Sequence, residues 1–368
     1  MSAPAAPGRT NGAAITLQAI RAAPKVLLHD HLDGGVRVAT IIELADQSGH
    51  VLPTNDGAAL RQWFVRGAKS LDILQYLETF QHTAGVMQTA DALERVAFEA
   101  ALDLASDGVV YAEVRFAPEL HQERGLALDA VMDAVQAGFR RGEAAAAATG
   151  RQISVNTIVC AMRTATRSVE IAELAVRWRD RDEHVVAFDI AGAETGWPPS
   201  LHADAFALVR AAQMHITVHV SEPPDLLLIA DGLAHGAERI GHGVRIMTDI
   251  DRTDPHDWKL GRLARAVLER QIHLEMAPSC HVHVGAVPSF ERHPIAELLR
   301  HGFSVGVNTD NRLMSDVTVA GEVHAVAQAF ELSWAEIGAL QRQAMEHSFA
   351  DWTTRRRIVD DVLAPAFT

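Results

Sequence analysis

Cysteine is scarce in this chain, and its scarcity excludes a whole class of proteins. Only Cys160 and Cys280 occur among the 368 residues, and they lie far apart in the sequence. Two distant cysteines cannot build the dense disulfide framework of small secreted domains. The pattern fits a reducing compartment, so we expect a cytoplasmic protein.

Positive charge is also in short supply. Lysine and arginine together number 33 against 47 aspartates and glutamates, which gives a formal net charge of −14. Such a balance excludes a nucleic acid backbone as the partner of the protein as a whole. Long hydrophobic runs are missing as well, and none is long enough to span a membrane. We therefore expect neither a nucleic acid nor a membrane as partner.

The N-terminus lacks the marks of a signal peptide. Its first residues, MSAPAAPGRTNGAA, are rich in alanine, proline and glycine and contain no basic segment followed by an apolar stretch. We expect residues 1–14 to be a disordered tail and residues 15–368 to form one domain. Hydrophobic residues make up 48% of the chain, enough for a large core.

Eight short apolar runs predict the fold. They are typical of strands that are buried on both faces of a parallel sheet, and helical patterns separate them. Their residue ranges are 25–31, 109–118, 153–160, 184–192, 215–222, 238–243, 272–279 and 303–310. Eight repeats of strand and helix predict an α/β fold, a (β/α)8 TIM barrel.

One long excursion interrupts the barrel pattern after the first run. It covers roughly residues 36–108 and includes SLDILQYLETFQHTAGVMQ (70–88), which we expect to be a helix. Extra helices after a barrel strand lie over the carboxyl face, where they can form a lid. Leu71, Leu74, Leu77 and Phe80 recur every three residues, so one face of the helix is apolar. Packing on the barrel rim explains that face nearly as well.

Two histidines one residue apart end the first run, KVLLHDH. Residues i and i+2 of a strand point to the same face, so His29 and His31 present two imidazoles side by side. The ends of later runs carry further polar groups, namely His219, Glu222, His242 and Asp310. The strand ends of a barrel converge around one axis, so we expect these side chains to meet.

Three histidines and one aspartate form a ligand set that suits zinc and leaves one position open for water. Zinc lowers the pKa of that water to about 7, so we expect one zinc ion per chain and a hydrolase or deaminase. Glu222 is the expected proton carrier, because hydrolytic loss of ammonia needs a proton delivered to the substrate ring. His242 is either a further ligand or a base in the outer shell.

Simpler structural roles compete with these. Asp33 precedes Gly34 and Gly35 and fits a tight turn as well as it fits a site. Asp310 and Asn311 fit a helix cap, a role that is compatible with metal binding.

The end of the seventh run carries a further histidine cluster. We expect His281 and His283 to be loop residues, and contact with a substrate is their less favoured role. Cys280 is expected to be a small packing residue.

Several motifs together resemble the adenosine deaminase family of metal-dependent amidohydrolases. They are HDHLDG, AGAETG, HVSE, RIGHG and GVNTDN, and they occur in this order from Pro24 toward the C-terminus, with YAEVRFAP in the second run. The resemblance implies that zinc is bound by four side chains, those of His29, His31, His219 and Asp310.

The resemblance also implies roles for the other residues. Glu222 matches the acid that protonates purine N1, and His242 matches the histidine that orients the attacking water and helps to deprotonate it. Asp310 shares in handling that proton. The implied substrate contacts are His31, Asp33 at the ribose 5′-hydroxyl, Gly192 through its N–H at N3, and Asn311 at N7. A purine nucleoside is the expected small-molecule partner.

Some positions depart from the family pattern. HVSE stands where the family has HAGE, AGAE where it has AGDE, NTDN where it often has NTDD, and His281 where it tends to carry asparagine. We expect zinc-dependent hydrolytic deamination of adenosine or 2′-deoxyadenosine to the inosine product. The departures leave open another 6-aminopurine, such as adenine, an aminofutalosine-type nucleoside or a modified adenine nucleoside. A non-catalytic adenosine-binding protein is the less favoured alternative.

Overall fold

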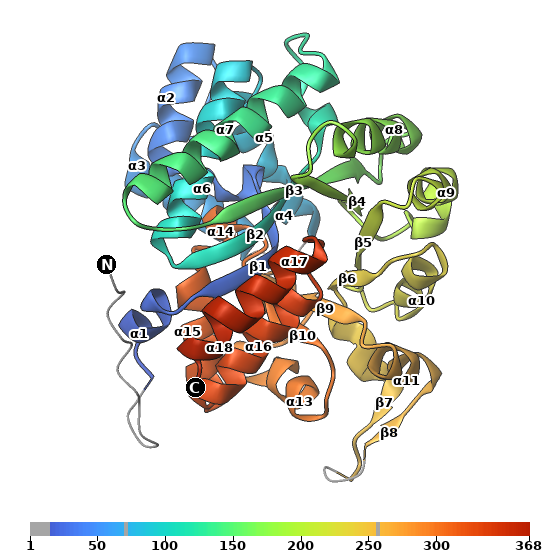
Figure 1. Cartoon of the computed structure of the whole chain (residues 1–368). Coiled ribbons are helices and arrows are strands. Elements are labelled where there is room, and N and C mark those ends of the chain that lie inside the picture. Colours follow the sequence, from blue (N-terminus) through green and yellow to red (C-terminus); the bar gives the residue numbers. More distant parts are fainter. Residues whose placement is uncertain (1–14, 70–72, 255–257) are drawn as a thin grey trace.

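Eight parallel strands form a nearly closed barrel in the computed structural model, which describes residues 15–69, 73–254 and 258–368 (Figure 1). The strands are β1 (Lys25–His31), β2 (Val109–Phe116), β3 (Ser154–Met162), β4 (Val185–Ala191), β5 (His215–Val220), β6 (Arg239–His242), β9 (His273–Met276) and β10 (Val305–Val307). They pair in this order around the sheet, so the predicted TIM barrel is confirmed. The tail predicted at residues 1–14 lies outside the described residues.

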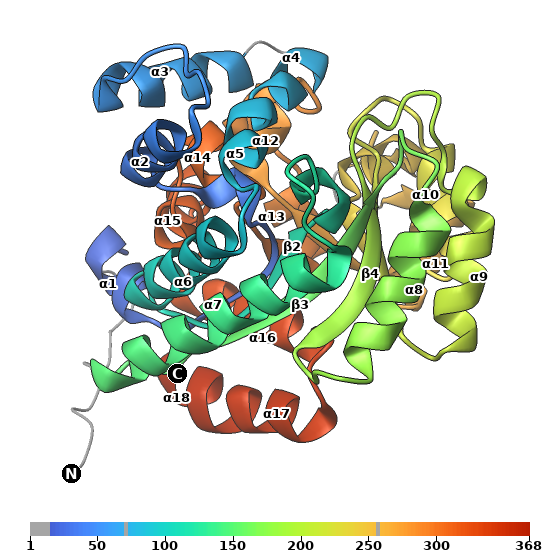
Figure 2. The same cartoon turned by 90° about the horizontal axis from the view of Figure 1, so that it is seen from above.

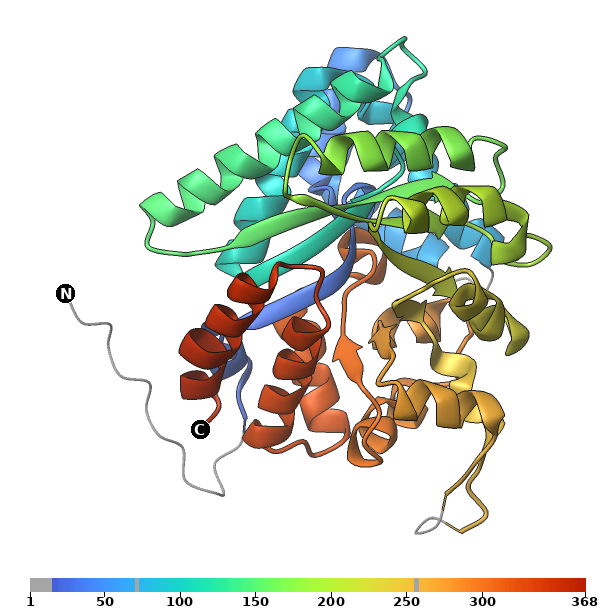
Figure 3. The same cartoon turned by 45° about the vertical axis from the view of Figure 1, so that its right-hand side comes forward.

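Each of the eight predicted runs overlaps one barrel strand, and only β3 extends beyond its run, by two residues. Several strands are shorter than the runs, because a run also covers residues that turn away from the sheet toward the carboxyl face. A small antiparallel hairpin of β7 (Ile250–Asp251) and β8 (Lys259–Leu260) was not predicted from the sequence. It projects from the body of the molecule (Figures 1 and 3). Strands of two residues are too short to leave an alternating pattern.

The barrel closes between its first and last strands through a side chain as well as the backbone. The Asn308 side chain accepts hydrogen bonds from the backbone N–H groups of Leu28 and His29, both at 3.0 Å. Beyond it, the N–H of His31 donates to the carbonyl of Asp310 at 2.8 Å, and the N–H of Asp310 donates to that of His29 at 3.0 Å. The segment after β10 is therefore fixed against the histidine pair of β1.

Helices surround the sheet (Figure 2). Their bounds are α1 (Leu17–Ala22), α2 (Val38–Ser48), α3 (Gly57–Ala68), α4 (Ile73–Glu78), α5 (Phe80–Val86), α6 (Ala90–Ser106), α7 (Leu128–Ala148), α8 (Ser168–Arg179), α9 (Ala203–Ala211), α10 (Leu227–Ala234), α11 (Arg262–Glu269), α12 (Pro278–His283), α13 (Ile295–Arg300), α14 (Arg312–Ser315), α15 (Val319–Ala329), α16 (Trp334–Glu346), α17 (Trp352–Arg357) and α18 (Ala364–Ala366), with a π-helix at Ile358–Leu363. Short 3-10 helices occupy Asp33–Gly35, Pro118–His121, Pro199–His202, Val244–Asp249 and Phe290–Arg292. In the part of the chain that is described, no helix has the length and apolar character needed to cross a membrane.

The core lies between the strands and this helical layer. Phe188 of β4 and Phe206 of α9 are fully buried and meet edge to face, with their ring centroids 5.8 Å apart. Such contacts hold each helix against the strand beside it, and they fix the positions of the strand ends.

The excursion after β1 contributes α2 to α6. The single helix predicted over residues 70–88 is wrong, because α4 ends at Glu78 and α5 begins at Phe80. The Thr79 hydroxyl donates to the carbonyl of Tyr76 at 2.6 Å, which is a local alternative to a helical bond. Leu71 lies outside the described residues. Figure 2 shows α4 and α5 beside α12, and Tyr76 contacts Cys280 there.

Candidate metal centre and catalytic site

Four of the predicted side chains meet at the carboxyl ends of the strands. His29 and His31 come from β1, His219 comes from β5, and Asp310 follows β10. Their ligand atoms all lie within 4.8 Å of one another. Asp310 Oδ1 lies 3.2 Å from His29 Nε2 and 3.3 Å from His31 Nε2, and His31 Nε2 lies 3.1 Å from His219 Nε2. These side chains can hold a metal ion.

The carboxylates behind two of the histidines test whether a cation fits. His29 Nδ1 lies 2.9 Å from Glu275 Oε2, and His219 Nδ1 lies 2.7 Å from Asp189 Oδ2. A carboxylate only accepts, so each Nδ1 carries the proton and each Nε2 presents a lone pair. His29 Nε2 is buried without a hydrogen-bond partner among the described residues. Lone pairs and a carboxylate that converge on one point fit a cation.

One buried arginine joins the two supporting carboxylates. Arg115 of β2 donates to Asp189 at 2.6 Å and to Glu275 at 2.7 Å, and all three side chains are fully buried. Because β2 and β9 are not neighbours in the sheet, this bridge crosses the barrel interior. Burial alone raises the pKa of Asp189, but His219 and Arg115 outweigh it and lower this pKa to about 2. Two of the three candidate histidine ligands, His29 and His219, therefore rest on one ionised network.

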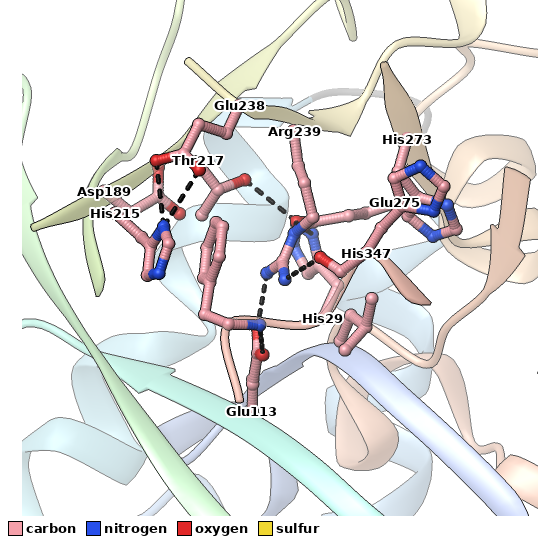
Figure 4. Close-up of polar contacts among 12 residues, drawn as sticks. His29, Glu113, Asp189, His215, Thr217, Glu238, Arg239, His273, Glu275 and His347 are labelled. Atoms are coloured by element: carbon pink, nitrogen blue, oxygen red, sulfur yellow. Dashed lines mark hydrogen bonds and ion pairs between the residues drawn. The ribbon is translucent and has the colours of Figure 1, made fainter. Parts of the chain in front are cut away.

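A second arginine extends this network below the metal site. Arg239 of β6 donates to Glu275 at 2.7 Å and also contacts Glu113 of β2 (Figure 4). The Thr217 hydroxyl donates to Glu275 at 2.9 Å. Glu275 thus receives bonds from four directions, which fix the carboxylate that orients His29.

Glu222 lies beside the metal cluster with the properties of an acid. Burial, then the charges of Glu194 and Asp310, raise its pKa well above the usual range of a glutamate, and Arg163 opposes the shift. Glu222 Oε1 lies 3.8 Å from His242 Nε2. A carboxyl group with a raised pKa keeps its proton to a higher pH than an ordinary glutamate and can donate it to a bound substrate.

Three residues at this site adopt a left-handed backbone. Ser221, His242 and Asp310 have φ angles of 82°, 70° and 56°. This region costs a residue with a Cβ about 1–2 kcal/mol. Strain of this kind often marks positions where the backbone turns so that a side chain faces a ligand.

A cavity of about 490 Å³ opens over these groups. Glu222 and His242 line it, and Leu77 and Phe80 of the excursion line it from α4 and α5. Three members of the metal cluster also line it, namely His31, His219 and Asp310. Asp33, Gly192 and Asn311, the predicted substrate contacts, also face it. The cavity is large enough for a ligand of nucleoside size.

Two of these predicted contacts have unusual surroundings. Burial raises the pKa of Asp33 to about 7, and its Oδ1 has no partner in the described part of the chain. The Asn311 amide donates to the Tyr76 hydroxyl at 2.7 Å, so Tyr76 links α4 to the site. A Cβ on Gly34 would lie 2.1 Å from Asn311 Oδ1, which explains the glycine after Asp33.

Comparisons with known proteins agree with this geometry. The sequence model of the adenosine deaminase family matches residues 24–365. The adenosine deaminase of Mycobacterium sp. (strain JLS) is 52% identical over 355 residues, which cover 96% of this chain and 98% of that protein. The adenosine deaminase of Mycobacterium tuberculosis (strain ATCC 25177 / H37Ra) is 50% identical over 357 residues, or 96% and 97%. The chain belongs to the adenosine deaminase family.

Solved structures share the fold of this family member. An adenine deaminase from Arthrobacter aurescens superposes with a TM-score of 0.79 at 24% identity, covering 93% of this chain and 99% of that one. An amidohydrolase from Burkholderia ambifaria, solved with bound Zn, gives a TM-score of 0.81 at 23% identity, covering 99% and 96%.

The structure shows what surrounds the residues that depart from the family motifs HAGE and AGDE. Val220 is fully buried, and Ser221 has a φ of 82° at the position where the adenosine deaminase family has glycine. The Ser221 hydroxyl accepts a hydrogen bond from the Arg245 N–H at 3.3 Å, a contact that glycine cannot make. Ala193 lines the cavity, so the AGAE change alters the surroundings of the substrate.

The predictions for the histidine cluster after β9 were wrong. His281 and His283 lie in α12, not in a loop, and His281 Nε2 lies 3.0 Å from His242 Nδ1. Cys280 is buried as expected, but it does more than pack, since its Sγ donates to Asp310 Oδ2 at 2.7 Å.

Sequence reasoning missed the residues that support the site. Arg115, Asp189 and Glu275 had no predicted role, although Arg115 lies within the motif YAEVRFAP. The available signal was the presence of charged residues inside three strands that are buried along most of their length. Buried charges of this kind need partners, and the partners here are the ligands and one another.

Proposed function

We propose that this protein hydrolytically deaminates adenosine and 2′-deoxyadenosine to inosine and 2′-deoxyinosine, with release of ammonia. The observation that carries the proposal is the position of Glu222, a carboxyl group with a raised pKa, beside the cluster of His29, His31, His219 and Asp310. The cluster holds one zinc ion per chain in this proposal. The cavity over both supplies the space for a purine nucleoside.

The chain's own residues divide the chemistry between them. Zinc, when bound, supplies a water molecule whose pKa is lowered to about 7. Glu222 gives its proton to purine N1, which withdraws electrons from C6 and opens that carbon to attack. His242 and Asp310 orient the water and handle its proton. The water oxygen forms a bond to C6, the amino group takes up one water proton, and the C6–N bond breaks to release ammonia. The second water proton restores the carboxyl group of Glu222, while N1 keeps the proton that Glu222 gave it.

The remaining contacts hold the substrate. Asp33 meets the ribose 5′-hydroxyl, and the Gly192 N–H meets N3. The Asn311 amide has two N–H donors, of which one serves Tyr76 and the other is free to donate to N7. His31 lines the cavity at the metal and contacts the substrate there. The enzyme acts in the cytoplasm in this proposal.

A second candidate is the same chemistry on a different 6-aminopurine. It is favoured by Ala193 and Ser221, which replace motif residues next to the cavity and the acid. Adenine, an aminofutalosine-type nucleoside and modified adenine nucleosides are the members of this class. A non-catalytic adenosine-binding protein is disfavoured, because every proton-transfer residue is present.

One assay separates these candidates. Absorbance at the purine band and ammonia release are followed with adenosine, 2′-deoxyadenosine, adenine and AMP, and the E222Q variant serves as the control. We expect the two nucleosides to have the highest kcat/KM. A preference for adenine would select the second candidate, and no turnover on any of the four substrates would overturn the proposal.

A further inference from the structure

Three buried imidazoles form a chain that leads away from the catalytic site. His242 Nδ1 lies 3.0 Å from His281 Nε2, and His281 Nδ1 lies 2.8 Å from His293 Nε2. The three residues are only 1%, 0% and 2% exposed. The rings of His281 and His293 are nearly parallel, with an angle of 10° between their planes. The chain thus continues from β6 through α12 to the residue before Pro294.

A backbone N–H at the far end of this row of histidines determines which ring nitrogen donates in each hydrogen bond. The N–H of Ile295 donates to His293 Nδ1 at 3.3 Å. An amide nitrogen only donates, so His293 Nδ1 carries the lone pair and its Nε2 carries the proton.

The donor and acceptor of the other two hydrogen bonds follow from this assignment. His293 Nε2–H donates to His281 Nδ1, which leaves the proton of His281 on Nε2. His281 Nε2–H donates to His242 Nδ1, which leaves the proton of His242 on Nε2. Each contact between two nitrogens needs one proton and one lone pair, so this is the arrangement that satisfies all three bonds. Burial also lowers the pKa of His281 to about 3, in agreement with a neutral ring.

We propose that His281, held by His293, is a positioning residue that fixes His242 in the tautomer with its proton on Nε2. His242 then meets the reacting water as a hydrogen-bond donor, and Asp310 is the acceptor on the same side of the cavity. The proposal rests on the proposed function and deepens it, because it assigns the orientation of the water to His242 and the acceptance of its proton to Asp310. It also gives a role to the histidine at a position where the family tends to carry asparagine.

The tautomer can be observed directly. In protein labelled with 15N in histidine, long-range 15N–1H correlation spectra distinguish a protonated from an unprotonated ring nitrogen. The signals of His242 are assigned by their loss in the H242Q variant, with and without zinc. We expect a protonated Nε2 and an unprotonated Nδ1 in the wild type. A protonated Nδ1 would overturn the proposal, and this readout does not depend on turnover of any substrate.

Kinetics supply the second test, with variants that differ only in the donor. H281Q keeps an N–H near the position of His281 Nε2, whereas H281L removes it. We expect H281L to lower kcat by about 10–100-fold with KM changed less than about threefold, and H281Q to recover most of that loss. H283L, in the same helix, is the control, because His283 Nδ1 has no partner in the described chain.

The outcomes separate the two proposals. Equal kcat values for H281L and H281Q, at equal thermal stability, would overturn the role of His281. If H281L does not fold, H293L tests the same chain one ring further out, and an unchanged His242 tautomer there would contradict the proposal. Failure of the wild type to deaminate any purine would instead overturn the proposed function and leave the tautomer result standing.

Discussion

The carboxylate of Glu194 holds the backbone of Glu222. Its two oxygens accept hydrogen bonds from the N–H groups of Ser221 and Glu222 at 2.8 Å and 3.0 Å. Glu194 is 3% exposed, and its charge contributes to the raised pKa of the Glu222 side chain. One buried carboxylate thus fixes the position of the acid and helps to keep it protonated.

Replacing Glu222 by glutamine is expected to lower kcat by about 10²–10⁴-fold while metal content and KM stay near the wild type. Glutamine keeps the shape of the side chain but has no carboxylic proton to give to N1. Steady-state kinetics on adenosine, with metal analysis of the same sample, measure this. E183Q, at an exposed glutamate before β4, is the control. A kcat close to that of the wild type in E222Q would remove Glu222 from the mechanism.

Loss of a metal ligand is expected to empty the site. H29A and D310A each remove one of the converging ligand atoms and are expected to bind well below one zinc ion per chain, as measured by elemental analysis after dialysis. H215A is the control, because His215 lies at the other end of the same strand as His219 and pairs with Glu238. Full zinc content in both ligand variants would show that the ion is bound elsewhere.

Asp33 is expected to discriminate against nucleotides. An ionised carboxylate at the 5′ position repels a 5′-phosphate, and about 1.4 kcal/mol of repulsion is enough for a tenfold lower kcat/KM on AMP than on adenosine. Because the pKa of Asp33 is about 7, the carboxylate is mostly ionised at pH 8 and mostly neutral at pH 6. The ratio of kcat/KM on adenosine to kcat/KM on AMP should therefore be larger at pH 8 than at pH 6, and D33N should lower this ratio. Equal kcat/KM values for AMP and adenosine in the wild type would contradict this role.

The excursion is expected to act as a lid over the cavity. Leu77 lines the cavity, so L77S should raise KM for adenosine several-fold with a small change in Tm. L126S is the matched control, since Leu126 is also half-buried but packs against the core, and it should lose stability with unchanged KM. If L77S loses stability and keeps the kinetics of the wild type, α4 is core and not a lid.

Glu322 is expected to make stability depend on pH. It accepts two hydrogen bonds from Ser279, yet burial raises its pKa from 4.5 to about 7. The fold therefore prefers the neutral carboxyl group. This contribution is fully present below about pH 4.5 and is lost as the pH rises through 7, by about 3 kcal/mol in total.

The E322Q variant isolates this contribution. The difference in unfolding free energy between wild type and E322Q, from urea titrations at several pH values, should shift in favour of E322Q between pH 5 and pH 8. If this difference in unfolding free energy is the same at pH 5 and pH 8, then Glu322 is already ionised in the folded protein at pH 5, which would contradict the prediction.

The barrel and its ligands could be predicted because each depends on local pattern. An apolar run marks a buried strand, and a polar residue at its end marks the carboxyl face, as for His29, His219 and Asp310. Arg115, Asp189 and Glu275 could not be predicted, because their pairing joins strands that are remote in sequence. The break at Thr79 was missed for a different reason, since a threonine side chain that replaces a helical bond leaves the apolar spacing of Leu77 and Phe80 unchanged.

Ser221 has a consequence for how far this chain can be stabilised. Its φ of 82° is comfortable for glycine and costs a serine about 1–2 kcal/mol, which the bond from the Arg245 N–H partly offsets. Glycine would suit this backbone better, so the serine is a departure from what the fold alone prefers. Laboratory selection for heat resistance would therefore tend to replace Ser221 by glycine. Ser221 is adjacent to Glu222, so the added backbone freedom of glycine would work against catalysis.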